Sequence, residues 1–114
     1  MDLVEVCYRL TKQFPDREKF GLSIQLQRAA VSVPANIAEG HGRKSTGAYL
    51  NHLSIANGSL SELETHLLIG VRLEYVMDEG SAKALVLLDE VGRMLAGMIR
   101  SLEERSSSRQ SPRS

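Results

Sequence analysis

The sequence is poor in aromatic residues, with three Tyr, two Phe and no Trp among 114 residues. A hydrophobic core must therefore come from Leu, Ile, Val, Ala and Met, which suits packed helices. Proline is equally scarce and occurs only at positions 15, 34 and 112. No segment alternates apolar and polar residues with the period of two that is typical of a strand. These shortages favour an all-α protein.

Cysteine and long apolar runs are also scarce. Cys7 is the only cysteine, which excludes an internal disulfide. We expect it on the apolar face of the first helix, where a free thiol packs as a small hydrophobe. No apolar run approaches the roughly 18 residues of a membrane span, and the N-terminus has no signal-peptide pattern. We therefore expect a cytoplasmic protein with no membrane partner.

An excess of one charge is missing too. Fourteen basic and fourteen acidic residues give a formal net charge of zero. This balance argues against strong nucleic-acid binding by a monomer, which needs a basic excess. The charges are unevenly distributed, however, because residues 61–104 hold nine acidic and four basic residues, and residues 105–114 hold three arginines and no acidic residue.

Apolar residues recur with a helical period in four segments. The first runs from Asp2 to about Phe14 and ends before Pro15. The second runs from residue 18 or 22 to Glu39, and we predict a kink near Pro34 because the apolar stripe keeps its phase across that proline. The third spans 45 or 46 to 75, and the fourth spans 78 or 81 to 105.

Four such helices with short connections predict an antiparallel up-down-up-down four-helix bundle. We assign residues 1–105 to this domain and 106–114 to a flexible basic tail. The first predicted helix is about 20 Å long and the third about 45 Å at the rise of an α-helix. Because the first helix cannot cover the third, the uncovered apolar length predicts self-association.

Polar residues form a second line on each of the two middle helices. They are Arg28, Ser32, Asn36 and Glu39 on the one, and Ser54, Gly58 and Glu62 on the other. A turn at residues 43–44 brings these lines together, and we interpret them as a structural seam that fixes helix register. Gly58 is expected to allow close approach to Ser32 or Ala29, and Arg28 to pair with Glu62.

The other motifs do not support an enzyme. A di-iron bundle needs Glu-x-x-His pairs, and no histidine here has a glutamate three residues before it. The segment from Gly40 to Ser45 lacks the glycine spacing and preceding strand of a phosphate loop. Ser59 lacks a nucleophile elbow. We predict no catalytic residue, no metal, no cofactor and no small-molecule substrate.

The turn between the two middle helices remains as a candidate contact site. Arg43, Lys44 and Ser45 stand next to the free N–H groups that begin the third helix, and such groups can hold a phosphate. We regard these three residues as candidate anion or nucleic-acid contacts. The alternative is a solvated turn with no ligand.

A long motif covers residues 25–64. It reads QLQRAAVSVPANIAEG at 25–40 and LSIANGSLSELE at 53–64. The chain thereby resembles, over roughly residues 1–100, the four-helix-bundle family also called the 23S ribosomal RNA intervening-sequence protein or S23 family. Its members carry Q-L-x-R-A-x-x-S-[IV]-P-x-N-I-A-E-G followed by L-x-x-A-x-G-S-x-x-E-L-E. The chain lacks the tryptophan of the family's opening D-L-x-V-W, so its first helix is expected to be short.

The resemblance implies a bundle that assembles into a ring, typically a homopentamer. Some relatives are encoded within insertions of ribosomal RNA genes, and distant ones accompany reverse transcriptases and contact nucleic acid. We therefore predict a non-enzymatic homo-oligomeric scaffold or interaction module whose partner is itself. The alternative is an RNA- or DNA-binding accessory protein, in which Arg43, Lys44 and the arginine tail are repeated around a ring.

Overall fold

The structure, a computed structural model, describes residues 2–110, and for residues 107–110 it describes the backbone alone. Within this range the chain forms four α-helices and one short 3-10 helix, and no β-strand. They are α1 (Asp2–Thr11), η1 (Asp16–Glu18), α2 (Leu22–His41), α3 (Thr46–Arg72) and α4 (Asp78–Gln110). The prediction of an all-α fold with four helices is confirmed.

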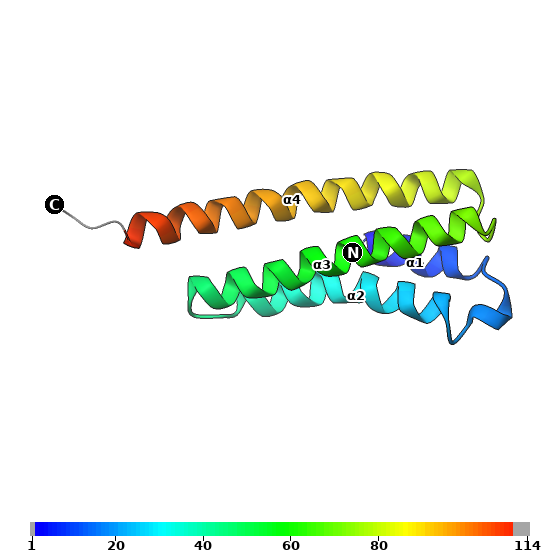
Figure 1. The fold of residues 1–114 in the computed structure, drawn as a ribbon, viewed down its shortest axis with the longest axis horizontal. Coiled ribbons are helices and arrows are strands. Elements are labelled where there is room, and N and C mark those ends of the chain that lie inside the picture. Colours follow the sequence, from blue (N-terminus) through cyan, green and yellow to red (C-terminus); the bar gives the residue numbers. More distant parts are fainter. Residues whose placement is uncertain (1, 111–114) are drawn as a thin grey trace.

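The helices pack in a closed cycle of neighbours. Helix α1 packs against α2 and α4, and α3 packs against the same two helices. In Figure 1 the turn between α2 and α3 lies at the left end and the turn between α3 and α4 at the right end. Over the described residues no Cα atom of α2 comes within 8 Å of α4. Helices α2 and α4 are therefore diagonal to each other, with α1 and α3 between them.

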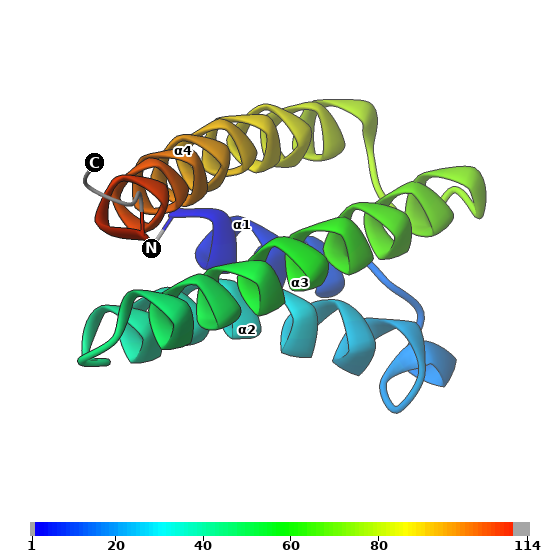
Figure 2. The same ribbon diagram turned by 60° about the vertical axis from the view of Figure 1, so that its left-hand side comes forward.

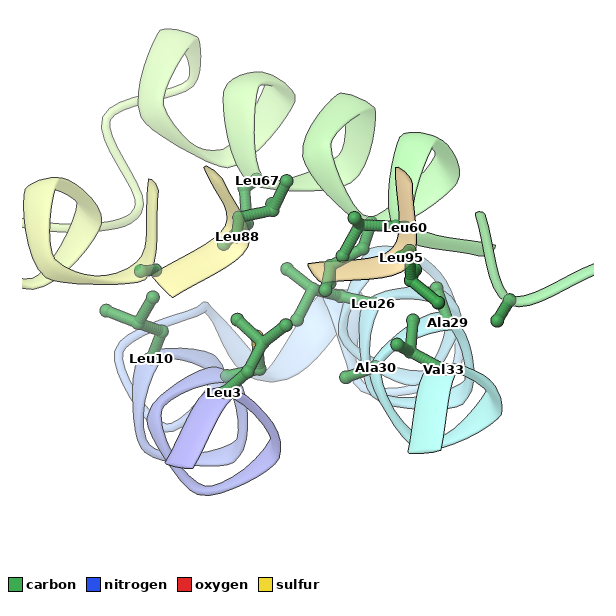
Figure 3. Close-up of a cluster of buried hydrophobic side chains, with 14 of the residues drawn as sticks. Leu3, Leu10, Leu26, Ala29, Ala30, Val33, Leu60, Leu67, Leu88 and Leu95 are labelled. Carbon is green, nitrogen blue, oxygen red and sulfur yellow. The ribbon is translucent and has the colours of Figure 1, made fainter. Parts of the chain in front are cut away.

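Leucines from all four helices fill the core. Figure 3 shows Leu3, Leu10, Leu26, Leu60, Leu67, Leu88 and Leu95 converging between the helices. Each of these leucines is at most 5% exposed. Full burial of one leucine contributes about 1.5–3 kcal/mol to folding, so this aliphatic layer is the main source of stability, as the shortage of aromatics predicts.

Helix α1 is shorter than predicted. It ends at Thr11, and the residues up to Phe14 form tight turns in which the Gln13 amide bonds to the Leu10 carbonyl at 2.9 Å and the Phe14 amide bonds to the Thr11 carbonyl at 3.1 Å. The next residue is Pro15, which disfavours helical geometry in the residue before it. At its other end α1 begins near the middle of the bundle, while α2, α3 and α4 continue to the left (Figure 1).

Helix α3 begins and ends with recognisable caps. The Ser45 hydroxyl accepts a hydrogen bond from the Ala48 amide at 3.1 Å, as an N-cap serine does. At the other end Glu74 has a left-handed φ of 61°. The Tyr75 amide bonds to the Gly70 carbonyl at 2.9 Å and the Glu74 amide bonds to the Val71 carbonyl at 3.0 Å. This pattern is a Schellman motif, and it ends α3 before the predicted residue 75.

Helix α2 passes through Pro34 without interruption. Helix α4 continues to Gln110, so the first residues of the predicted flexible tail are helical. The sequence contains neither glycine nor proline between Gly97 and Pro112, and nothing in that interval stops a helix. The rest of the predicted tail, residues 111–114, lies outside the described residues.

Candidate functional site

Four polar side chains connect α2 to α3 along a continuous line. The hydroxyl oxygens of Ser32 and Ser59 lie 2.8 Å apart. The Asn36 amide nitrogen donates to the Ser32 carbonyl at 2.9 Å and to its hydroxyl at 3.0 Å. The Asn36 oxygen lies 3.2 Å from Nδ1 of His52. We call these four residues, Ser32, Asn36, His52 and Ser59, the polar seam.

The seam fixes the proton position on His52. Because the nitrogen of Asn36 donates to a carbonyl, its oxygen must accept, and Nδ1 of His52 must therefore carry the proton. The other ring nitrogen, Nε2, lies 3.3 Å from the donor Nε of Arg43 and accepts from it. The same guanidinium contacts Glu39 Oε2 at 3.2 Å. A neutral His52 thus links the seam to the turn.

The predicted seam residues divide into two groups. Ser32 and Asn36 lie in the seam, and Glu39 joins it through Arg43. Arg28, Ser54 and Glu62 are exposed. Among the described residues the expected ion pair between Arg28 and Glu62 does not form, because both side chains point to solvent from their helices.

The expectation for Gly58 is wrong. Gly58 is exposed, and a Cβ atom placed on it meets nothing within 4 Å. The close approach of α2 to α3 occurs at Gly40, where a Cβ atom would lie 2.9 Å from the Cβ atom of His52 and 2.9 Å from Cδ1 of Tyr49. Gly40 therefore sets the spacing of the two helices beside the turn.

Two members of the seam, His52 and Ser59, were not predicted from the sequence. Both share one helical stripe with the buried residues Ala56 and Leu63, at steps of four, three and four residues. That stripe faces the core. A polar residue within a buried stripe was the available signal, and Ser59 is only 9% exposed.

The candidate anion contacts at the turn are partly engaged. Arg43 is held by Glu39 and His52. The Ser45 hydroxyl is used as the cap of α3. Lys44 is exposed and forms no ion pair among the described residues. Of the three predicted contacts, Lys44 is therefore the one whose side chain is least engaged by neighbouring residues and most available to a ligand.

The described part of the chain contains no group of three His, Cys, Asp or Glu side chains arranged to hold a metal ion. Both ring nitrogens of His66 are buried without a hydrogen-bond partner, so this histidine stands outside the seam network. None of the helices in residues 2–110 is long and apolar enough to cross a membrane.

The fold and its interhelical seam define the class as a four-helix protein of the bundle type. The family model described as 23S rRNA-intervening sequence protein matches residues 1–97. The chain belongs to this family. A solved structure from Bacteroides thetaiotaomicron VPI-5482, described as a protein with unknown function from the S23 ribosomal protein family, is 26% identical. The match covers 84% of this chain and 87% of that one, with a TM-score of 0.74. No curated protein matches the chain.

Proposed function

We propose that this protein is a non-enzymatic, cytoplasmic interaction module that works as a homo-oligomer, in the form of a ring. The observation that carries the proposal is a set of apolar side chains left on the surface of the two longest helices. These are Ile55, Leu68 and Ile69 on α3, Leu73 directly after the last residue of α3, and Val86 and Met94 on α4, each 39–59% exposed.

Several of these side chains gather at one end of α3. Leu68, Ile69 and Leu73 lie within two helical turns, and Met77 follows in the connection to α4 with 75% of its surface exposed. Single exposed hydrophobes are ordinary, but a contiguous group indicates a contact surface. A closed ring joins two different patches, and α3 and α4 offer one patch each. The resemblance to the family supports five subunits.

The contacts of the polar seam support a structural rather than a catalytic role for the polar side chains between α2 and α3. Its hydroxyl, amide and imidazole groups bond to one another and to the backbone. A satisfied interior network of this kind specifies a unique packing arrangement. It leaves no nucleophile or general base directed at a substrate.

Size-exclusion chromatography with light scattering tests the proposal. We expect wild-type protein at micromolar concentration to have a mass of several chains. Leu73→Glu should lower that mass, because it places a charge in an apolar contact. Asn57→Glu is the matched control, since Asn57 is an exposed polar residue of α3, the helix that Leu73 follows, and it should leave the mass unchanged. A monomeric wild type contradicts the proposal.

A second candidate, an accessory protein that binds RNA or DNA, is favoured by Lys44. This exposed cation stands beside the N-terminus of α3, and helix N-termini attract phosphate. One such contact is weak, so binding would depend on repetition around a ring. We expect salt-sensitive binding that weakens on Arg43→Glu, on Lys44→Glu, or on loss of residues 105–114. Absence of a gel shift at low salt would remove this candidate.

A further inference from the structure

A pocket lies at the end of α1, where the chain turns through η1 into α2. It has a volume of about 400 Å³, and all the residues that line it fall within one continuous stretch of the chain, from Tyr8 to Gln27. Figure 2 shows the connection from α1 to α2 at the lower right, on the side of the bundle away from α4. Gln110, the last described residue, lies at the opposite end of the bundle (Figure 1). Internal segments alone therefore form this hollow, which we call the α1–α2 pocket.

The walls of the pocket are mainly apolar and aromatic. They consist of Tyr8, Phe14, Pro15, Phe20 and Ile24. Phe14 is buried, whereas Phe20 is 84% exposed and is the most exposed large hydrophobic side chain in the described part of the chain. A hollow of this size, with apolar walls and a few polar groups, is the usual form of a small-molecule site. Aromatic walls favour a planar aromatic ligand, because rings stack on one another.

Two buried hydroxyl groups lie among these walls, and they differ in their contacts. The Thr11 hydroxyl donates to the Tyr8 carbonyl at 2.7 Å and accepts from Nε2 of Gln27 at 2.9 Å. Ser23 is only 7% exposed, and its hydroxyl forms no hydrogen bond with any group in residues 2–110. A buried hydroxyl without a partner costs stability. Ser23 is therefore the group in the pocket that a bound ligand would satisfy.

The start of α2 adds two further donors beside that hydroxyl. Helix α2 has 20 residues, and the amide of its first residue, Leu22, donates to Glu18 Oε1 at 3.2 Å. The other oxygen of Glu18 accepts from the Tyr75 hydroxyl at 2.9 Å, so this carboxylate is already engaged. The next two amides, of Ser23 and Ile24, have no acceptor within the described residues. Free amides at a helix N-terminus attract an anion, and here they stand with an unpartnered buried hydroxyl.

The charged side chains of the lining favour an anion with a single charge. Two lysines, Lys12 and Lys19, and one acid, Asp16, line the pocket. None of the three takes part in an ion pair within residues 2–110. The Lys19 Nζ lies 5.7 Å from the centroid of the Phe20 ring, so a cation stands at the aromatic wall. This excess of one positive charge matches a carboxylate better than a phosphate monoester, which carries nearly two negative charges.

We propose that the α1–α2 pocket binds a small aromatic carboxylate. The ring of the ligand packs against Phe20 and Pro15. Its carboxylate lies at the start of α2, where the hydroxyl and amide of Ser23 donate to it and Lys12 and Lys19 balance its charge. The ligand is not a substrate, because the lining contains neither histidine nor cysteine and no base stands beside the Ser23 hydroxyl. The pocket shares no residue with the apolar surface proposed for ring assembly, so the two proposals are independent.

Isothermal titration calorimetry with the full-length protein tests the proposal. The probe is naphthoate, and naphthylmethanol and naphthylmethylamine carry the same ring system with a neutral and a cationic group. We expect naphthoate to bind once per chain and about tenfold more tightly than the other two, because hydrogen bonds to a charged group are the stronger ones. Added salt should weaken naphthoate binding and leave naphthylmethanol binding unchanged. Naphthyl phosphate should bind no more tightly than naphthoate.

Two exposed positions test the charge and the aromatic wall without disturbing the core. Lys19→Glu should weaken naphthoate about fivefold or more and strengthen naphthylmethylamine. Its control is Lys83→Glu, which changes an exposed lysine of α4 outside the pocket and should leave affinity within about twofold. Phe20→Leu keeps an apolar side chain but removes the ring, and it should weaken naphthoate about threefold. Val31→Ala, at an exposed apolar position of α2 outside the pocket, is its control.

Ser23→Ala separates a binding role from a structural one. Alanine removes the unpartnered hydroxyl and favours the helix, so the thermal midpoint of the free protein should rise. The affinity for naphthoate should fall about threefold or more, because one donor is lost. A serine that only supports the fold would give the opposite result, a lower thermal midpoint with unchanged affinity. Far-UV circular dichroism checks that each variant folds.

Several results would overturn the proposal. They are equal affinity for the anionic, neutral and cationic naphthyl probes, tighter binding of naphthyl phosphate, equal loss of affinity in Lys19→Glu and Lys83→Glu, and unchanged affinity in Ser23→Ala. Self-association through Leu73 is measured separately by light scattering. A monomeric protein that binds naphthoate would therefore contradict the ring alone, and a ring that binds no naphthoate would contradict the pocket alone.

Discussion

Cys7 lies fully enclosed in the core, on the inner side of α1. Burial raises the pKa of its thiol from 9.0 to about 11, because the core cannot solvate a thiolate. The thiol therefore stays protonated and unreactive at neutral pH. Cys7 therefore packs as a small apolar side chain, as the sequence predicts.

The raised pKa makes stability depend on pH in the alkaline range. Below pH 9 both the folded and unfolded chains keep the thiol proton. Between pH 9 and 11 the unfolded chain loses it first, so the free energy of unfolding falls by about 1.4 kcal/mol per pH unit. We expect Cys7→Val to lack this part of the decrease. Urea unfolding of both proteins at pH 8 and pH 10.5 measures it, and parallel decreases in the two would contradict the prediction.

Two glycines should respond in opposite directions to an added methyl group. Gly58 lies exposed in a helix with open space around it, so Gly58→Ala should raise the free energy of unfolding by about 1 kcal/mol. A Cβ atom on Gly40 would lie only 2.9 Å from atoms of His52 and Tyr49, so Gly40→Ala should lower the free energy of unfolding by about 1–3 kcal/mol through overpacking. Chemical denaturation measures the free energy of unfolding of both variants and of the wild type. A stabilising Gly40→Ala would show that the contact relaxes freely.

At the scale of elements, the seam joins α2 to α3 through Asn36. Asn36→Ala would leave the Ser32 hydroxyl and the His52 ring short of one partner each. We expect a loss of about 1–3 kcal/mol in the free energy of unfolding. Asn51→Ala is the control, because Asn51 is an exposed asparagine of α3 and should change stability by less than about 0.5 kcal/mol. Equal losses of stability in Asn36→Ala and Asn51→Ala would contradict a structural role for the seam.

The end of α3 offers a second prediction for an element. Glu74 holds the left-handed position of the Schellman motif, which costs a residue with a side chain about 1 kcal/mol. Glycine adopts this conformation without strain. We therefore expect Glu74→Gly to raise the thermal midpoint, while Glu79→Gly in the first turn of α4 lowers it. A lower thermal midpoint for Glu74→Gly would indicate that the Glu74 side chain stabilises the fold by more than its left-handed conformation costs.

At the scale of the whole molecule, the helices should differ in local stability. Helices α2 and α3 form the most extensive pairing in the described structure, and α1 has only 10 residues. Elements with few packed neighbours open at low free energy. We expect amides of α1 to exchange with deuterium faster than those of residues 50–67 in α3. Equal protection would mean that the bundle opens only as one unit.

The sequence predicts the fold well because four helices of period 3.6 leave a clear apolar pattern. It predicts helix ends less well, since the end of α3 depends on Glu74 adopting an unusual φ and the end of α1 on turns before Pro15. The sequence predicts only part of the polar seam. One residue on a helix is a rotation of about 100°, and that rotation decides whether Gly58 or Ser59 faces α2.

The start of α1 in mid-bundle affects how this protein should be handled in the laboratory. A purification tag fused ahead of Asp2 would start in the middle of the bundle, where α2, α3 and α4 continue past α1 (Figure 1). Tethering by a short linker gives millimolar local concentrations, enough for a tag with helical tendency to pack against those helices. A tag placed after α4 starts from the far end of that helix and avoids this contact.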